Sequence, residues 1–154
     1  MSDTNAPDTN GAGKKPGATR VSWSKTAANR RRGGDVRVML SPRTVNSTSG
    51  FMGLLTLAPG EFVTEHYHPY SEEFFYVTSG RLHLRVGEEY VELGPDDAAM
   101  VPMGVRHRAE NRGTEPVRAV FHLGPLAPRP ELGHVDTEQL PNPSAPGSLV
   151  GDRQ

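Results

Sequence analysis

Short runs of β-forming residues, separated by turn residues, constrain the fold of this chain more than any other feature of its sequence. Each run is rich in Val, Leu, Phe or Tyr and ends at a cluster that contains Gly, Pro, Asn or Asp. No stretch repeats its apolar residues with the 3.6-residue period of an amphipathic helix. Closely spaced short strands are typical of antiparallel sandwiches and barrels. The sequence therefore predicts an all-β fold with little helix, with strands at residues 36–40, 53–57, 62–68, 74–78, 82–86, 90–93, 98–101, 107–111 and 117–123.

The two ends of the chain differ in composition from its centre, which predicts three segments. Residues 1–34 are polar and rich in Asn, Thr, Gly and Lys, as expected of a largely flexible tail. Its basic run, Arg30-Arg31-Arg32, is interpreted as a solvated flank rather than a phosphate-binding patch. Residues 128–154 form a Pro-rich extension, whose five prolines deny it regular hydrogen-bonded structure. A single domain is expected between them, at residues 35–127.

Charge and cysteine content exclude several classes of function. The 17 basic and 18 acidic residues give a net charge of −1, so no overall field favours nucleic acid or an acidic membrane. No run approaches the ~18 apolar residues of a membrane span, and the N-terminus lacks the apolar stretch of a signal peptide. A cytoplasmic protein is therefore expected. Because the chain has no cysteine, any metal must be held by nitrogen and oxygen ligands.

The stretch from Gly60 to Gly80 contains the first group of candidate site residues. His66 and His68 lie two positions apart within a predicted strand. Alternate strand residues share a face and lie about 6.6 Å apart along it, so two imidazoles can converge on one ion. In the next strand, alternation directs either Glu72 or Glu73 inward, beside the two histidines.

A second candidate stretch runs from Asp97 to Asn111. Pro102 and Gly104 make a turn immediately before the strand that begins at His107, and such a turn fixes the direction of the first strand residue. Asn111 has the same parity as His107. It is expected either to tie a turn or to touch the substrate.

Together, these two stretches resemble the two motifs of the cupins. Gly60-x5-His66-x-His68-x4-Glu73-x6-Gly80 is similar to the first motif, and Pro102-x-Gly104-x2-His107-x3-Asn111 is similar to the second. One departure is Asp96, which stands where the second motif normally opens with a glycine. The resemblance implies a small jelly roll that binds one divalent metal ion through His66, His68, Glu73 and His107. Glu73 is preferred to Glu72 because only Glu73 keeps the six-residue step to Gly80.

Two further strand histidines are interpreted differently. His83 is expected to face away from the core, because Leu82 and Leu84 take the inward positions of its strand. His122 lies on the strand 117–123, which a hairpin would place beside the strand that begins at His107. One register puts His122 opposite His107, and the other puts Phe121 there. His122 is therefore a further candidate metal ligand, which would turn Glu73 into an outer partner of the site.

A closer resemblance extends over about residues 31–138. The segments RRGGDVRVMLSP, GFMGLLTLAPGEFVTEHYHPYSEEFFYVTSG and GPLAPRPELGHVDTE are similar to the small single-domain cupins of bacterial aromatic polyketide pathways, such as the tetracenomycin-type and resistomycin-type cyclases. The resemblance implies a metal-dependent cyclase of antibiotic biosynthesis that directs aldol-type closure of a poly-β-ketone made on an acyl carrier protein. His66, His68, Glu73 and His107 would then be catalytic. A monomer or a homodimer is expected.

The residue types suit this chemistry. An aldol closure needs a polarised carbonyl, a stabilised enolate and a base. Zinc is the expected ion, because it is redox-silent and accepts nitrogen-rich ligands, and iron, nickel and manganese are the alternatives. An apolar wall for the substrate is expected from inward-facing Phe75, Val77, Leu82 and Leu84, with Tyr70 and Met103 near its mouth.

Two other functions fit the same motifs. Three histidines and a glutamate on Fe(II), Ni(II) or Mn(II) also describe a cupin dioxygenase or monooxygenase that acts on an aromatic polyketide. A third hypothesis is a non-catalytic cupin that binds a small molecule. The ligand residues do not distinguish these functions.

Overall fold

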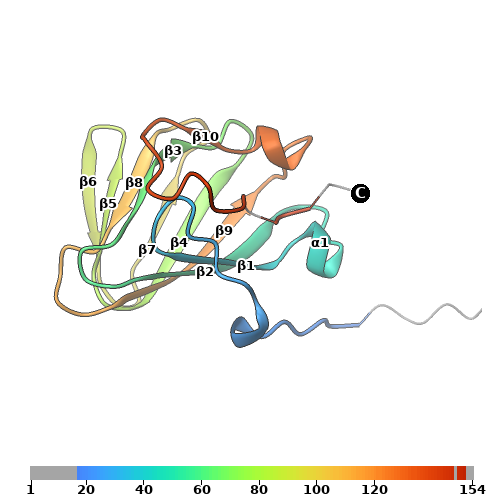
Figure 1. Ribbon diagram of the computed structural model, residues 1–154, viewed down its shortest axis with the longest axis horizontal. Helices are drawn as coiled ribbons and strands as arrows, with labels where there is room; N and C mark the ends of the chain where they lie inside the picture. The colour runs from blue at the N-terminus through green and yellow to red at the C-terminus, as the bar shows by residue number, and fades with distance from the viewer. Residues whose placement is uncertain (1–16, 148, 152–154) are drawn as a thin grey trace, which may run out of the picture.

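Two antiparallel sheets face each other in the computed structural model, which describes residues 17–147 and 149–151. The first sheet consists of β1 (Asp35–Leu40), β2 (Phe51–Leu57), β9 (Val117–Gly124), β4 (Glu72–Ser79) and β7 (Ala98–Val101), in that spatial order. The second consists of β10 (Val135–Asp136), β3 (Phe62–Tyr67), β8 (His107–Glu110), β5 (Leu82–Val86) and β6 (Glu89–Leu93). Figure 1 shows the two sheets as the layers of a sandwich.

Helical structure among the described residues is limited to single turns. These are α1 (Pro42–Val45) and two 3-10 turns, η1 (Trp23–Lys25) and η2 (Pro130–Leu132). The prediction of an all-β fold with little helix is thus confirmed. Each predicted strand is present, with its ends displaced by no more than two residues. No helix in the described part of the chain is long and apolar enough to cross a membrane.

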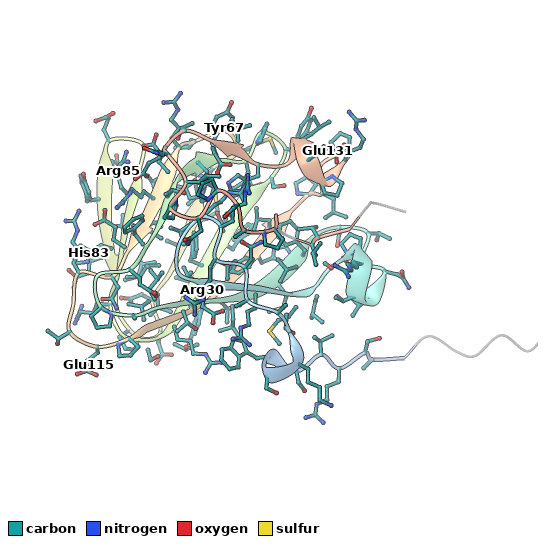
Figure 2. All side chains as sticks on the ribbon, viewed as in Figure 1. Arg30, Tyr67, His83, Arg85, Glu115 and Glu131 are labelled. Atoms are coloured by element: carbon teal, nitrogen blue, oxygen red, sulfur yellow. The ribbon has the colours of Figure 1, made fainter. Side chains whose placement is uncertain are left out.

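Alternation along the strands creates the core between the sheets. In β9, the residues at 117, 119, 121 and 123 are buried, whereas the intervening side chains are exposed or half-buried. Phe75 and Val77 of β4 and Leu82 and Leu84 of β5 are also buried, as predicted. His83 faces the other way and lies at the edge of the molecule in Figure 2. Apolar burial of this kind is the main favourable contribution to folding.

The predicted hairpin between residues 107–111 and 117–123 is wrong. β8 pairs with β3 and β5, whereas β9 pairs with β2 and β4 in the opposite sheet. Asn111 ties the loop that crosses between the sheets. Its side-chain amide donates to the carbonyls of Leu57 (2.9 Å) and Glu115 (2.8 Å), and its oxygen accepts from the Gly113 N–H (2.9 Å). The turn-tying role is therefore the one that the structure supports for Asn111.

The C-terminal segment returns to the second sheet after β9. We call residues 128–147 the strap. Its short strand β10 pairs with β3, so that Val135 lies opposite Tyr67 and Asp136 lies opposite His66. Figure 1 shows the orange-to-red strap passing beside β3 and then beside the blue N-terminal segment.

The described part of the predicted N-terminal tail contacts the strap through residues 29–31. The Asn29 amide donates to the Pro146 carbonyl (3.1 Å), and the Asn142 amide donates to the Arg30 carbonyl (2.7 Å). The Arg31 guanidinium donates to the Ala145 carbonyl (2.8 Å). Residues 1–16 of the predicted flexible tail 1–34 lie outside the described residues.

Candidate metal centre

Four predicted side chains converge between the sheets. His66 and His68 come from β3 and the residue just after it, His107 opens β8, and Glu73 comes from β4 in the opposite sheet. One donor atom from each of these four residues lies within 4.8 Å of all the others, and all four residues are buried. The pairing of β3 with β8 sets His66 directly opposite His107. The structure thus brings together the four residues that match the two motifs, and Glu73 rather than Glu72 is the buried carboxylate.

Local turns hold the two motifs in register. Gly104 has a φ of 77°, which favours glycine, and its N–H donates to the His68 carbonyl (2.9 Å). Asp96, which replaces the usual glycine, also has a positive φ of 69°. Aspartate tolerates this left-handed conformation better than most residues do. The Tyr76 hydroxyl also donates to the Asp96 carboxylate (2.6 Å), so the turn survives the replacement.

Backbone carbonyls fix the ring orientation of all three histidines. The Nδ1 atoms of His66, His68 and His107 lie 2.7, 2.8 and 3.0 Å from the carbonyls of Thr64, Gly133 and Val105, respectively. A carbonyl only accepts, so each Nδ1 must carry the proton. In a neutral ring, this arrangement leaves the Nε2 lone pair available to a cation. Partners of this kind orient metal-binding histidines in proteins.

Glu73 and His107 form the charged pair of the cluster. Glu73 Oε2 lies 2.7 Å from His107 Nε2 and 3.2 Å from His68 Nε2. Desolvation favours the neutral acid, but the hydrogen bond from His107 holds the pKa of Glu73 well below its usual range. Desolvation likewise opposes the charged form of His107, but Glu73 raises the pKa of that ring. Burial lowers the pKa of His66 well below its ordinary value, so His66 is neutral.

The donor set fits a divalent metal ion. It offers three imidazole nitrogens and one carboxylate oxygen, a combination that binds zinc and other transition metals. His68 Nε2 is buried and, despite its distance to Glu73, has no partner with hydrogen-bond geometry. A buried polar atom without a partner is costly. An ion among the four donor atoms would satisfy it.

His122 is not part of this cluster, which corrects the prediction that it could be a metal ligand. Its side chain lies on the outer face of the first sheet, where its ring centroid is 6.0 Å from that of Phe74. The physical reason is the pairing of β9. With Phe121 and Leu123 buried toward the core, alternation forces His122 outward.

The four residues of the cluster line a cavity of about 360 Å³, to which both sheets contribute side chains. Its wall is mostly apolar and includes Val36, Val38, Phe51, Leu55, Val63, Phe75, Phe121 and Leu123. Arg32, Glu131 and His134 also line it. Of the predicted wall residues, Phe75 lines the cavity, whereas Val77, Leu82 and Leu84 lie in the core beside it. Tyr70 and Met103 are exposed and do not line the cavity, and their position near its mouth stays a prediction.

Sequence reasoning missed His134, which the strap places next to the cluster. Its ring stacks on that of His66, with centroids 4.2 Å apart and planes 17° from parallel. Its Nε2 lies 3.0 Å from the Asp136 carboxylate. Desolvation, together with the nearby Arg32 charge, lowers the pKa of His134, so the ring is neutral. The available signal was the PLAPRPELGH segment, which carried part of the family resemblance.

Comparisons with known proteins identify the family of this chain. Residues 53–123 match the cupin domain family. The chain is 53% identical over 134 residues to the tetracenomycin polyketide synthase protein TcmJ of Streptomyces glaucescens. This alignment covers 87% of this chain and 90% of TcmJ. The chain is also 58% identical over 110 residues to polyketide synthase CurC of Streptomyces cyaneus, and this alignment covers 71% of each protein.

Among solved structures, the polyketide cyclase RemF from Streptomyces resistomycificus matches with a TM-score of 0.64. The match covers 82% of this chain and 89% of that one at 16% sequence identity, so it shows a shared fold. On the strength of the matching motifs and relatives, the chain belongs to the cupin superfamily, within the family of small single-domain cupins that includes TcmJ and CurC.

Proposed function

We propose that this protein is a metal-dependent polyketide cyclase that directs aldol-type ring closure of a poly-β-ketone. The observation that carries the proposal is that all four residues of the donor cluster line a mostly apolar cavity. The chain's similarity to the polyketide synthase proteins TcmJ and CurC supports the substrate class. An aromatic polyketide intermediate, presented on an acyl carrier protein, is the proposed substrate.

His66, His68, Glu73 and His107 are the proposed metal ligands. When bound, a divalent ion would supply Lewis acidity that polarises a carbonyl and stabilises an enolate. Zinc is the proposed ion, because ring closure requires no change in oxidation state. The carbonyl partners of the three Nδ1 atoms keep each ring in the tautomer that a cation requires.

The protein must also accept a proton from the methylene group between two ketones, which is already acidic. Glu73 suits this role because its hydrogen bond with His107 favours the ionised carboxylate. Its burial keeps bulk water away from the reacting atoms. A neutral imidazole of the cluster is the alternative base.

The cavity wall contributes by selecting one fold of a long, flexible substrate. Val38 and Leu55 line it from the first sheet, and Val63 and Ala109 line it from the second. Holding two reacting carbons together can remove several kcal/mol, up to about 7–11, from a barrier. Holding the substrate in one accurate fold is therefore the larger part of the proposed catalysis.

A second candidate function uses the same residues. Three histidines and a carboxylate also suit Fe(II), Ni(II) or Mn(II), the metals of oxygen chemistry in sites of this kind. An oxygenase would add oxygen mass to the polyketide, whereas a cyclase leaves its oxidation level unchanged.

One experiment separates these functions. A reconstituted synthase supplies the polyketone, with or without this protein, under air and under strict anaerobiosis, and products are compared by mass and ring pattern. We expect the correct ring pattern in both atmospheres with the metal-loaded protein, and spontaneously cyclised shunt products with the metal-free protein. Product that forms only in air and gains oxygen mass would replace the cyclase with the oxygenase.

A further inference from the structure

The strap touches the donor cluster at two consecutive residues. The Gly133 carbonyl accepts the Nδ1 proton of His68 (2.8 Å), and the His134 ring stacks on His66 (4.2 Å between centroids). His66 and His107 take their Nδ1 acceptors from residues two positions earlier in the chain. His68 instead takes its acceptor from a residue 65 positions away. Its ring orientation therefore depends on the strap being docked.

A chain of polar contacts holds this part of the strap in place. His134 Nε2 lies 3.0 Å from Asp136 Oδ1, and the Arg32 guanidinium donates to both oxygens of the same carboxylate (2.7 and 3.1 Å). Such two-point contacts between arginine and a carboxylate are the strongest and most directional ion pairs. Arg32 comes from the N-terminal segment and is mostly buried, with 17% of its side chain exposed. The N-terminal segment is thus connected to the cluster through Asp136 and His134.

A second anchor follows immediately along the strap. The Thr137 hydroxyl donates to the Glu65 carboxylate (2.7 Å) and its N–H donates to the Glu65 carbonyl (3.1 Å). Glu138 accepts from the Glu65 N–H (2.7 Å) and from the Arg108 guanidinium (3.0 Å). Two independent anchors mean that loss of the Arg32 contact loosens residues 133–136 without releasing the whole strap.

We propose that residues 133–136 are a positioning element of the metal centre, and that Arg32 holds this element in place through Asp136. The proposal rests on the proposed metal site. If Gly133 withdraws, His68 loses the acceptor that keeps its proton on Nδ1. The ring then samples the Nε2–H tautomer, which offers no lone pair toward the cluster. If His134 withdraws, His66 loses the ring that covers one of its faces.

The test measures the zinc affinity of the full-length chain by competition with a chromophoric chelator. Arg32→Gln removes the charge that holds Asp136, and Arg32→Lys keeps a charge without the two-point geometry. We expect Arg32→Gln to weaken zinc binding about 10-fold or more, the lower end of the range for outer partners of metal ligands. Arg32→Lys should fall between Arg32→Gln and the wild type.

Arg81→Gln is the matched control. Arg81 forms an exposed ion pair with Glu92 (2.8 Å) in the second sheet, and neither residue lines the cavity. Its zinc affinity should equal that of the wild type. Equal losses in Arg32→Gln and Arg81→Gln, or no loss in Arg32→Gln, would each overturn the positioning role.

A second measurement does not depend on metal. Imidazole ¹⁵N shifts in the metal-free protein report which nitrogen of His68 is protonated. We expect the Nδ1–H form in the wild type and in Arg81→Gln, and a mixture of tautomers in Arg32→Gln. A wild-type His68 tautomer in Arg32→Gln contradicts the strap mechanism alone. Zinc binding that is unaffected by His66→Ala contradicts the metal site itself, so the two failures are distinguishable.

Discussion

Each histidine of the cluster uses one ring nitrogen to contact the fold and directs the other toward its neighbours. His66 and His107 bond to carbonyls of their own chain segments, which are present as soon as the local turns form. His68 depends on Gly133 of the strap. The cluster therefore combines two locally determined ligands with one that depends on a distant contact.

Replacing a histidine that lies between the two sheets should remove the bound metal, whereas replacing a histidine on an outer face should not. We expect wild-type protein to carry about one divalent ion per chain. His66→Ala should lose most of this metal, because it removes one of four convergent donors. Metal analysis of the purified protein is the measurement.

His122→Ala is the natural control, because His122 lies on the outer face of the first sheet beside Phe74. It should retain wild-type metal content. Retention of full occupancy in His66→Ala, or a loss in His122→Ala equal to that in His66→Ala, would contradict the assignment of the ligands.

The same two histidines show what sequence could predict at this scale. His66 was identifiable because its spacing to His68 and its place in a motif are local properties of the chain. The orientation of His122 depends on which strands flank β9, and the sequence does not contain that information directly. A one-residue shift in pairing reverses every side chain of a strand. Gly133 gave no signal of its own, because its contribution to the site is a backbone carbonyl.

Among the elements, the strap was the hardest to predict. The strands of the two main sheets are bounded by strong turn residues, and each could be placed to within two positions. The strap contains prolines, the 3-10 turn η2 and the two-residue strand β10, so no periodic pattern marks it. Its position is determined by side-chain contacts with Arg31, Arg32, Glu65 and Arg108, which are distant in sequence.

The strap should detach more easily in acid, because Glu138 is one of its anchors. Although desolvation opposes the charged form, hydrogen bonds from the Glu65 N–H and Arg108 lower the pKa of Glu138. A carboxyl whose pKa is lower in the folded state stabilises the fold fully above its unfolded value of about 4.3. That contribution disappears as pH falls through the folded value.

We therefore expect Glu138→Gln to reduce the free energy of unfolding at pH 7, and the difference from wild type to shrink below about pH 4.3. Denaturant titrations at several pH values measure this difference. Glu115→Gln is the control, since Glu115 is an exposed residue in the loop between the sheets, far from the strap in Figure 2. A Glu138→Gln difference that stays constant down to acidic pH would show that the carboxylate does not anchor the strap.

At the scale of the whole molecule, the cavity is enclosed by both sheets and by both terminal segments. Its wall takes Val38 from β1, Ala109 from β8, Asn29 from the N-terminal segment and Gly133 from the strap. Most of the residues that line it lie outside the donor cluster. Wall and cluster can therefore be altered separately.

Filling the wall should change the product without removing the metal. Val38→Phe adds a ring to a half-buried position that lines the cavity. We expect zinc affinity to be unchanged and the share of shunt products from the reconstituted synthase to rise, because the substrate no longer fits in one fold. Product profiles and zinc titrations on the same preparation measure both effects.

Val91→Phe provides the comparison, because Val91 is 37% exposed on β6 and does not line the cavity. It should give the wild-type product profile. If Val38→Phe also leaves the ring pattern intact, the wall does not determine how the substrate folds.

The dependence of His68 on Gly133 also has a consequence for the order of events during translation. Ribosomes make chains from the N-terminus onward, and domains fold as units during synthesis. Residues 35–124, which supply all four convergent side chains, are made before residue 133 exists. The main strands of the two sheets can thus assemble before the strap is present. His68 receives its carbonyl partner only when the strap emerges and docks on β3.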